Sequence, residues 1–413
     1  ELGTQLTRTL TEHADVMSGS SLGLADVKGR ARSIRRRRTA TAVAGVAAAV
    51  AVIVPTVSLA THTSGKPEPA PVTQTPSPTQ TATADNGHQP KPGVLDVSDL
   101  PTGDAPALDY VEGRTFHLDD GSTGEVRSRY TPHAFVEMED GSRVWLTTHQ
   151  GSAYIELQNS DGGFDAPVPS GSYDLAVNPA HSIAAWISPA GQVWVYEGRA
   201  SEPRTWGAPV NGTEWRLGAV SGTTCSLACT VYVNASDAQG HRQVWEVTDA
   251  GTRQARDGGY LVLNDESEAG LSIGLTEIKD FSTCSKLLGS GEFQGFETCE
   301  NQLQSFSPDG QLILALPGYF DGAGPGGIAM YSLDDTKLFE RSSTEHVQSY
   351  FNDLNTAWED DTHVLAPTFQ DGKWALVRVA SDGSMEYAVP PAPGPYEDNP
   401  FILPTGGGLP SGA

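Results

Sequence analysis

Short runs of alternating apolar and polar residues fill the chain from about residue 94 to residue 413. The runs are rich in Val, Ile, Tyr and Trp, and turns of Asp, Asn, Ser and Gly separate them. Alternation with a period of two is typical of strands that bury one face. Asp-Gly pairs mark tight hairpins because both residues tolerate a positive φ, and they occur at Asp120-Gly121, Asp140-Gly141, Asp161-Gly162, Asp309-Gly310, Asp371-Gly372 and Asp382-Gly383. Residues 94–413 are therefore expected to form an all-β domain.

The same order of strands and turns recurs about every 40 residues. One unit contains an apolar strand, a turn, a second strand that often carries Trp, another turn and a third strand. The stretch from Leu175 to Tyr196 shows this plan, and the stretch from Ser305 to Ser332 repeats it. The units begin near Pro132, Tyr173, Trp215, Tyr260, Leu303 and Tyr350. Repeats of this length with four strands each are typical of the blades of a β-propeller.

Six such units cover residues 132–390, but two further strand candidates lie outside them. These are the residues around Thr115–Leu118 and the run Phe401–Pro404. Strands from both chain ends commonly share one blade, because this removes the unpaired edges that invite aggregation. We therefore expect seven blades, the seventh built from residues near 110–128 and near 398–404, and a ring of six blades is the alternative.

The longest apolar stretch lies near the N-terminus instead. Thr39 to Ala60 is an uncharged run of 22 residues, and four arginines precede it directly: Arg35, Arg36, Arg37 and Arg38. At a helical rise of about 1.5 Å per residue the run spans about 30 Å, the hydrocarbon thickness of a bilayer. Arginines stay on the cytoplasmic side. We therefore expect one transmembrane helix at 39–60 in the plasma membrane, a cytoplasmic tail with short helices at 1–38, and an exported remainder.

A cleaved signal peptide is the alternative to this anchor, because Ser58-Leu59-Ala60 offers small residues to a leader peptidase. The tail of 38 residues and the length of the apolar run favour the anchor. The outer domain is expected to be exported in either case.

Residues 61–93 are expected to form a disordered stalk rich in Pro and Thr. Prolines recur there at short intervals among Thr, Ser and Gln. Proline at this density prevents helices and central strands, and few apolar side chains are present to form a core. Such a segment extends by about 3.1 Å per residue.

The net charge of the chain differs between the two sides of the apolar run. Residues 1–38 carry 8 Lys and Arg against 4 Asp and Glu, whereas residues 67–413 carry 17 against 47, a net charge of −30. A basic tail suits the anionic inner leaflet. The acidic outer part repels nucleic acid, so no nucleic-acid partner is expected. No cofactor is expected either, and Ca²⁺ stays an option without a ligand motif.

Four cysteines lie in the outer part: Cys225, Cys229, Cys284 and Cys299. An oxidising compartment favours disulfides, and four cysteines allow three pairings. Pairing Cys225 with Cys229 and Cys284 with Cys299 is favoured because each bond then lies within one repeat unit. The spacings lack the C-x₂-C knuckles of zinc sites, so no metal site is predicted.

Candidate catalytic residues are few. Gly270-Leu271-Ser272-Ile273-Gly274 fits the G-x-S-x-G pattern, but a nucleophile elbow needs a strand before it and a helix after it. Acidic clusters occur at Glu137–Asp140, Asp334-Asp335 and Glu359–Asp361. Two carboxylates that met at the channel mouth could act as a pair, although solvated turns are the simpler explanation. The histidines are scattered, so no catalytic residue is predicted.

One hairpin resembles a known family. Phe306-Ser307-Pro308-Asp309-Gly310, followed by an apolar strand, resembles the F-S-P-D-G hairpin of WD40-like and TolB-like propeller repeats. With its Arg-rich tail, Ala/Val-rich span and Pro/Thr linker, the whole layout is similar to membrane-anchored WD40-like β-propeller proteins of high-GC Gram-positive bacteria. The resemblance implies this architecture and little chemistry, because most members of that group have no assigned activity.

Two functions agree with these features. An anchored propeller can present loops around its channel to an extracellular protein or glycan, as a binding or scaffold module without catalysis. The alternative is an extracellular hydrolase or lyase that acts on polysaccharide through carboxylates at the channel mouth. Because the sequence contains no catalytic motif in a suitable setting, it favours the binding module.

Overall fold

The computed structural model describes residues 93–405, apart from 199, 201, 256–258, 280–281, 290–292, 294, 319–325, 345–349 and 352–354. The expected tail (1–38), the membrane helix (39–60) with its preceding arginines, and all but the last residue of the stalk (61–93) lie outside the described residues. No helix in the described part of the chain is long and apolar enough to cross a bilayer.

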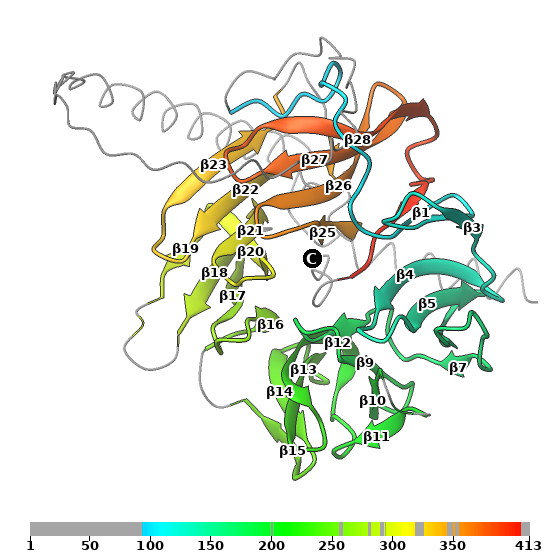
Figure 1. Ribbon diagram of the computed structural model, residues 1–413. Helices are drawn as coiled ribbons and strands as arrows, with labels where there is room; N and C mark the ends of the chain where they lie inside the picture. Colours follow the sequence, from blue (N-terminus) through cyan, green and yellow to red (C-terminus); the bar gives the residue numbers. More distant parts are fainter. Residues whose placement is uncertain are drawn as a thin grey trace, which may run out of the picture. The chain divides into compact units, whose positions relative to one another are not determined.

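In this part of the chain, 29 strands form seven antiparallel sheets, which are arranged as blades around a central axis (Figure 1). The expected all-β propeller with seven blades is therefore confirmed. The first strands of blades 2 to 7 begin within a few residues of the six predicted unit starts.

The strands divide among the blades as follows. Blade 1 contains β1 (Tyr110–Glu112), β2 (Thr115–His117), β3 (Thr123–Glu125) and β29 (Phe401–Ile402). Blade 2 contains β4 (Thr131–Glu137), β5 (Arg143–His149), β6 (Ser152–Gln158) and β7 (Val168–Pro169). Blade 3 contains β8 (Ala176–Val177), β9 (Ile183–Ile187), β10 (Val193–Glu197) and β11 (Arg204–Trp206). Blade 4 contains β12 (Thr213–Thr224), β13 (Ala228–Ser236), β14 (Arg242–Thr248) and β15 (Gly251–Gln254).

The remaining three blades complete the ring. Blade 5 contains β16 (Val262–Glu266), β17 (Ser272–Lys279), β18 (Ser282–Leu288) and β19 (Glu297–Thr298). Blade 6 contains β20 (Asn301–Phe306), β21 (Leu312–Pro317), β22 (Gly327–Ser332) and β23 (Lys337–Ser342). Blade 7 contains β24 (Tyr350–Phe351), β25 (Ala357–Trp358), β26 (His363–Gln370), β27 (Lys373–Ala380) and β28 (Met385–Pro393).

Blade 1 closes the ring with strands from both ends of the domain. β29 pairs with β1 through Val111 opposite Ile402 and Glu112 opposite Phe401. The chain then continues to blade 2, where the backbone N–H of Thr405 donates to the carbonyl of Phe135 over 2.8 Å. The composite blade expected from the two unassigned strand candidates is confirmed.

Apolar side chains pack between neighbouring sheets. Trp145 on β5 and Trp186 on β9 lie on the second strands, as the repeat pattern predicts, and at most 2% of either residue is exposed. One continuous apolar cluster joins blades 2, 3 and 4. Because both faces of an interior blade meet another blade, a strand such as β27 is buried on both sides, with six consecutive buried residues of which five are apolar.

Buried amide side chains also join successive blades. Each donates to a backbone carbonyl on the innermost strand of the next blade, so it satisfies a polar group that water cannot reach. The bonds run from Asn178 to Gly222 (2.8 Å), from Asn234 to Leu263 (2.9 Å) and from Asn264 to Leu303 (2.6 Å).

Residues 93–107, called here the N-terminal segment, run along the outer strands of two blades (Figure 1). Val94 forms a parallel bridge with Ser342 on β23, and Thr102 forms one with Tyr387 on β28. Leu95 and Leu100 are buried against these blades. The sequence pattern predicted no strand here, and the segment covers outer edges that would otherwise be unpaired.

Candidate functional site

A pocket of about 450 Å³ opens on the top face of blades 3 and 4. We call top face the side of the ring on which the first strands of the blades begin, near Thr131, Ala176, Thr213 and Val262. The pocket is lined by Gly171, Ser172, Tyr173, Asp174, Glu214, Trp215, Arg216, Asn234, Ala235, Ser236, Arg242 and Val262.

Three parts of the repeat bring these residues together. The loop after β7 supplies residues 171–174, the start of β12 supplies Glu214 to Arg216, and the turn between β13 and β14 supplies Ser236 and Arg242. All three are at the top face because alternate strands of a blade run in opposite directions. Gly171 allows the first loop to approach blade 3 closely, since a Cβ there would lie 2.3 Å from the carbonyl oxygen of Ser188.

Asp174 is the buried acid of the pocket, with 3% of its side chain exposed. Its Oδ1 lies 3.8 Å from Nη1 of Arg216, which is an ion pair too long for a hydrogen bond. Burial raises the pKa of Asp174 to about 6, against the opposing effects of Arg216 and the backbone N–H of Leu217. Asp174 therefore loses its negative charge in mildly acidic solution.

Arg242 on β14 supplies a second positive charge. Burial and the neighbouring charge of Arg216 lower the pKa of Arg242, and Glu214 opposes this shift. Among the described residues, neither guanidinium donates a hydrogen bond. Glu214 lies at the same rim, where Ser236 donates to its carboxylate over 3.4 Å.

Aromatic rings flank this charged group. Tyr173 is 53% exposed, and its hydroxyl donates to the carbonyl of Gly151 on blade 2 over 2.8 Å. The same tyrosine lines a second hollow of about 270 Å³, which extends toward Tyr154 and Pro189. Trp215 packs on the other side, where Gly191 leaves room for its ring. The two hollows share Gly171, Ser172 and Tyr173 in their linings, and we call the adjoining pair the groove; it combines aromatic surface with guanidinium donors.

The acidic clusters expected from the sequence do not meet in this groove. Asp140 and Asp334 accept hydrogen bonds from serines two residues away, at 2.6 Å and 2.5 Å, within their own turns. Asp361 accepts from the backbone N–H of Asp309 in the neighbouring blade over 3.0 Å. These carboxylates stabilise turns, as the simpler interpretation of the sequence proposed.

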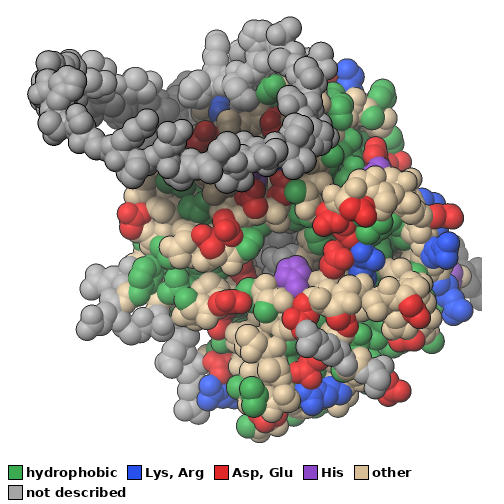
Figure 2. Space-filling view, in the orientation of Figure 1, with side chains coloured by type: hydrophobic (Ala, Val, Ile, Leu, Met, Phe, Trp, Pro, Cys, Tyr) green, Lys and Arg blue, Asp and Glu red, His purple; other side chains and the backbone are tan. Residues whose placement is uncertain are grey.

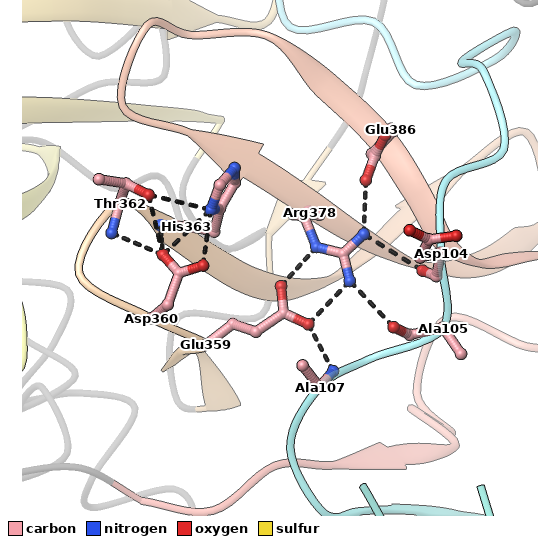
Figure 3. A network of polar contacts seen from close by, with 9 residues as sticks. All are labelled: Asp104, Ala105, Ala107, Glu359, Asp360, Thr362, His363, Arg378 and Glu386. Atoms are coloured by element: carbon pink, nitrogen blue, oxygen red, sulfur yellow. Dashed lines mark hydrogen bonds and ion pairs between the residues drawn. The ribbon is translucent and has the colours of Figure 1, made fainter. Parts of the chain in front are cut away.

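Glu359 belongs to a network that holds the N-terminal segment (Figure 3). Arg378 on β27 donates to Glu359 through two nitrogens and to Glu386 on β28 over 2.5 Å. The same guanidinium donates to the carbonyls of Asp104 and Ala105 over 3.1 Å each. With 10% of its side chain exposed, Arg378 fixes the segment to blade 7.

A second carboxylate pair lies between blades 1 and 2. Nη2 of Arg143 donates to Asp109 over 2.6 Å and to Glu137 over 3.0 Å, so the two acids share one guanidinium nitrogen. Burial raises the pKa of Glu137 to about 7, against the attraction of Arg143. Because Arg143 is bonded to both carboxyl groups, it occupies the place between them that the sugar of a glycosidase substrate would need.

The histidines make separate local contacts. His241 pairs with Asp237 and His363 with Asp360, each over 2.9 Å within one turn. His133 lies 2.6 Å from Thr148, and burial lowers its pKa. No group of three or more potential metal ligands occurs among the residues that the structure describes.

Both expected disulfides are present. Cys225 is bonded to Cys229 in the hairpin between β12 and β13, and Cys284 is bonded to Cys299 within blade 5. Ser272 of the G-x-S-x-G match is the first residue of β17 in a β-hairpin, without the helix that a nucleophile elbow needs.

The sequence pattern does not identify Arg216 or Arg242 as site residues, although it places Tyr173 and Trp215 at the starts of repeat units. A signal for Arg216 exists. Basic residues are rare in this acidic domain, and Arg216 directly follows a predicted start of an innermost strand. Arg242 carries no such signal, because its proximity depends on the register of the blade.

Comparisons with known proteins concern the fold. No family model matches the chain, and no curated protein matches it. Solved structures that resemble it include YCF48 bound to D1 peptide, with 12% identity and a TM-score of 0.42 over 70% of this chain and 87% of that chain. Virginiamycin B lyase from Staphylococcus aureus has 11% identity and a TM-score of 0.39 over 63% and 85%. The β-propeller domain of the Trilobed protease from Pyrococcus furiosus has 10% identity and a TM-score of 0.41 over 63% and 85%.

Proposed function

We propose that this protein is a membrane-anchored extracellular binding or scaffold module whose propeller takes a protein or glycan ligand without catalysis. The groove on the top face of blades 2 to 4 carries the proposal. It combines exposed aromatic surface at Tyr173 with two guanidinium groups that make no hydrogen bond to the described residues. Open grooves with aromatic and arginine side chains suit recognition, because they supply rigid contact area and directed donors.

The proposed location outside the cell rests on two features. Arg35 to Arg38 followed by the apolar run 39–60 orient the chain with its propeller outside. The two disulfides are consistent with an oxidising compartment.

The alternative is a hydrolase or lyase that acts on polysaccharide. Such an enzyme needs two carboxyl groups that face a common cleft. Among the described residues, Asp140, Asp334 and Asp361 accept hydrogen bonds from residues in turns. Glu359 accepts a hydrogen bond from Arg378. This arrangement supports binding over hydrolysis.

A binding screen with an activity readout distinguishes the two functions. The purified 413-residue chain is applied to arrays of envelope proteins and of acidic and neutral glycans, and bound glycans are then assayed for new chain ends. We expect retention of a ligand without cleavage, and weaker retention by Tyr173→Ala. New reducing or unsaturated ends would establish the enzyme, and retention that Tyr173→Ala leaves unchanged would remove the groove from the proposal.

A further inference from the structure

The positions of Arg216 and Arg242 follow from the register of blade 4. Arg216 on β12 lies opposite Asn234, and Arg242 on β14 lies opposite Ser236, on either side of β13. Asn234 and Ser236 are two residues apart, so their side chains point to the same face of the sheet. The two arginines therefore stand on one face, diagonally across a single strand, and both line the same pocket.

Three arginines elsewhere in the domain are engaged in close ion pairs. Arg143, Arg253 and Arg378 each have a carboxylate oxygen within 2.6 Å. Within the described residues, the one ion pair of Arg216 is with Asp174 at 3.8 Å, and Arg242 has none. Each guanidinium offers five N–H donors in a planar fork. Two unengaged forks that face one pocket form a receptor for an oxyanion.

The charge of the pocket selects the type of anion. Arg216 and Arg242 contribute two positive charges, and Asp174 and Glu214 contribute two negative charges when both acids are ionised. A neutral group of this kind suits a ligand with one negative charge and disfavours a dianion such as a phosphate monoester. Burial gives Asp174 a pKa of about 6, so acidification protonates this carboxylate. The net charge of the pocket then rises by one.

We infer that the pocket binds a carboxylate of the extracellular ligand between Arg216 and Arg242. The inference rests on the proposed binding function and names the chemistry of its ligand. A planar carboxylate matches the planar fork of a guanidinium. The carboxylate comes either from a peptide or from a uronate sugar, and in both cases the rest of the ligand lies along the groove past Tyr173.

Asp174 competes with the ligand for Arg216. When Asp174 is ionised it attracts the guanidinium, and when it is protonated Arg216 is free to bind the carboxylate. Leu217 contributes a backbone N–H to Asp174, and Arg242 and Glu214 are the other charged groups at this site. Binding therefore strengthens as the pH falls from about 8 toward 5, above the pKa of an ordinary carboxylate ligand.

The test uses the full 413-residue chain and two pairs of matched probes in NMR titrations. The first pair is a tyrosine-ended tripeptide with a free or an amidated C-terminus. The second pair is a glucuronate-containing tetrasaccharide and its neutral glucose counterpart. We expect one charged probe to bind at least about tenfold more tightly than its neutral partner, since a charged hydrogen-bond pair is lost in the latter. The pair that discriminates identifies the source of the carboxylate.

Four variants test the residues. Arg216→Gln and Arg242→Gln keep a polar side chain but remove the positive charge and the planar fork, and each should weaken binding of the charged probe at least about tenfold. Asp174→Asn should strengthen binding near pH 8 and remove its pH dependence. Arg253→Gln is the matched control, because this exposed arginine of the same blade pairs with Glu246 outside the pocket. Unchanged thermal unfolding of each variant confirms that its fold is intact.

Equal binding of charged and neutral probes would overturn the inference, and so would charged-probe binding that Arg216→Gln and Arg242→Gln both leave unchanged. If the chain retains an array ligand but discriminates neither pair of probes, the carboxylate site is wrong and the binding function stands. If the chain retains nothing on the arrays, the binding function itself fails.

Discussion

Asp265 shows how a single carboxyl group joins two blades. Its two oxygens accept hydrogen bonds from the backbone N–H of Glu266 (2.8 Å) and of Phe306 on blade 6 (2.9 Å). Burial raises the pKa of Asp265 to about 7 despite these donors. The ionised form is thus disfavoured in the folded state, and the protonated form prevails in mildly acidic solution.

We predict that Asp265→Asn both weakens the fold and flattens its pH dependence. An amide can accept only one of the two N–H bonds, which should cost about 1–3 kcal/mol of unfolding free energy. Because the pKa is raised on folding, the stabilisation from protonated Asp265 is complete below about pH 4 and is lost as the pH rises through 7. The free energy of unfolding should be measured in urea at several pH values. Its slope against pH should be smaller in the variant by up to about 1.4 kcal/mol per pH unit. An unchanged slope would mean that Asp265 is ionised throughout.

At the scale of elements, the two disulfides close loops of very different length. Cys284 and Cys299 are 15 residues apart and Cys225 and Cys229 are 4 apart. Loop-closure entropy predicts a stabilisation of about 3 kcal/mol for the longer loop and about 2 kcal/mol for the shorter one. Paired Cys→Ser variants, compared by urea unfolding, should reproduce this order. A larger loss from the short loop would show that local geometry outweighs chain entropy.

The contribution of the N-terminal segment to stability can be tested against a neighbouring deletion in the same chain. Deleting residues 93–107 removes the buried Leu95, Val97 and Leu100, exposes the apolar surface of blades 6 and 7 that they cover, and removes the backbone partners of Arg378, so the melting temperature should fall markedly. Deleting the Pro-rich residues 66–92 should leave the melting temperature unchanged, since a segment of this composition contributes no side chains to a core. Calorimetry of both deletions checks this. Equal melting would show that the segment adds no stability.

Patterns within one element were predictable, and contacts between elements were less so. Strand alternation and Asp-Gly turns place the blades, since these signals depend on neighbouring residues alone. The outer position of the N-terminal segment depends on partners at Ser342 and Tyr387, far along the chain. The pocket depends on the register of β12, which shifts between Thr213 and Arg216. A shift of this kind leaves no mark in the pattern of apolar residues.

The whole molecule is acidic and closed through one short strand. Figure 2 shows Asp and Glu side chains around the centre of the face in view, whereas most Lys and Arg side chains lie nearer its rim. Removing the residues after Tyr396 deletes β29 and leaves β1 without its inner partner. We expect this truncation to lose cooperative unfolding and to aggregate, because it opens the ring and exposes an edge. Calorimetry and light scattering measure both effects, and a truncation that melts like the intact chain would contradict closure by β29.

Topology is tested on intact cells. If the proposed anchor is right, a protease added outside should remove the propeller and spare residues 1–38, because arginines that precede an apolar run are retained on the cytoplasmic side. Immunoblots against each end of the chain distinguish the fragments. A propeller recovered in the medium, with its N-terminus near Thr61, would show a cleaved leader instead of an anchor.

The route by which the chain joins the ring has a mechanical consequence. The N-terminal segment runs parallel to β23 and β28, and it is bonded at Leu95 to Ser342 and at Gly103 to Tyr387. Tension drawn along the segment from Gly93 therefore loads these bonds together, in shear, and cannot open them one at a time. The first load falls on blades 6 and 7, whereas β29 closes the ring in blade 1. A propeller pulled by its N-terminus thus resists through two broad sheets, and its closing strand is spared.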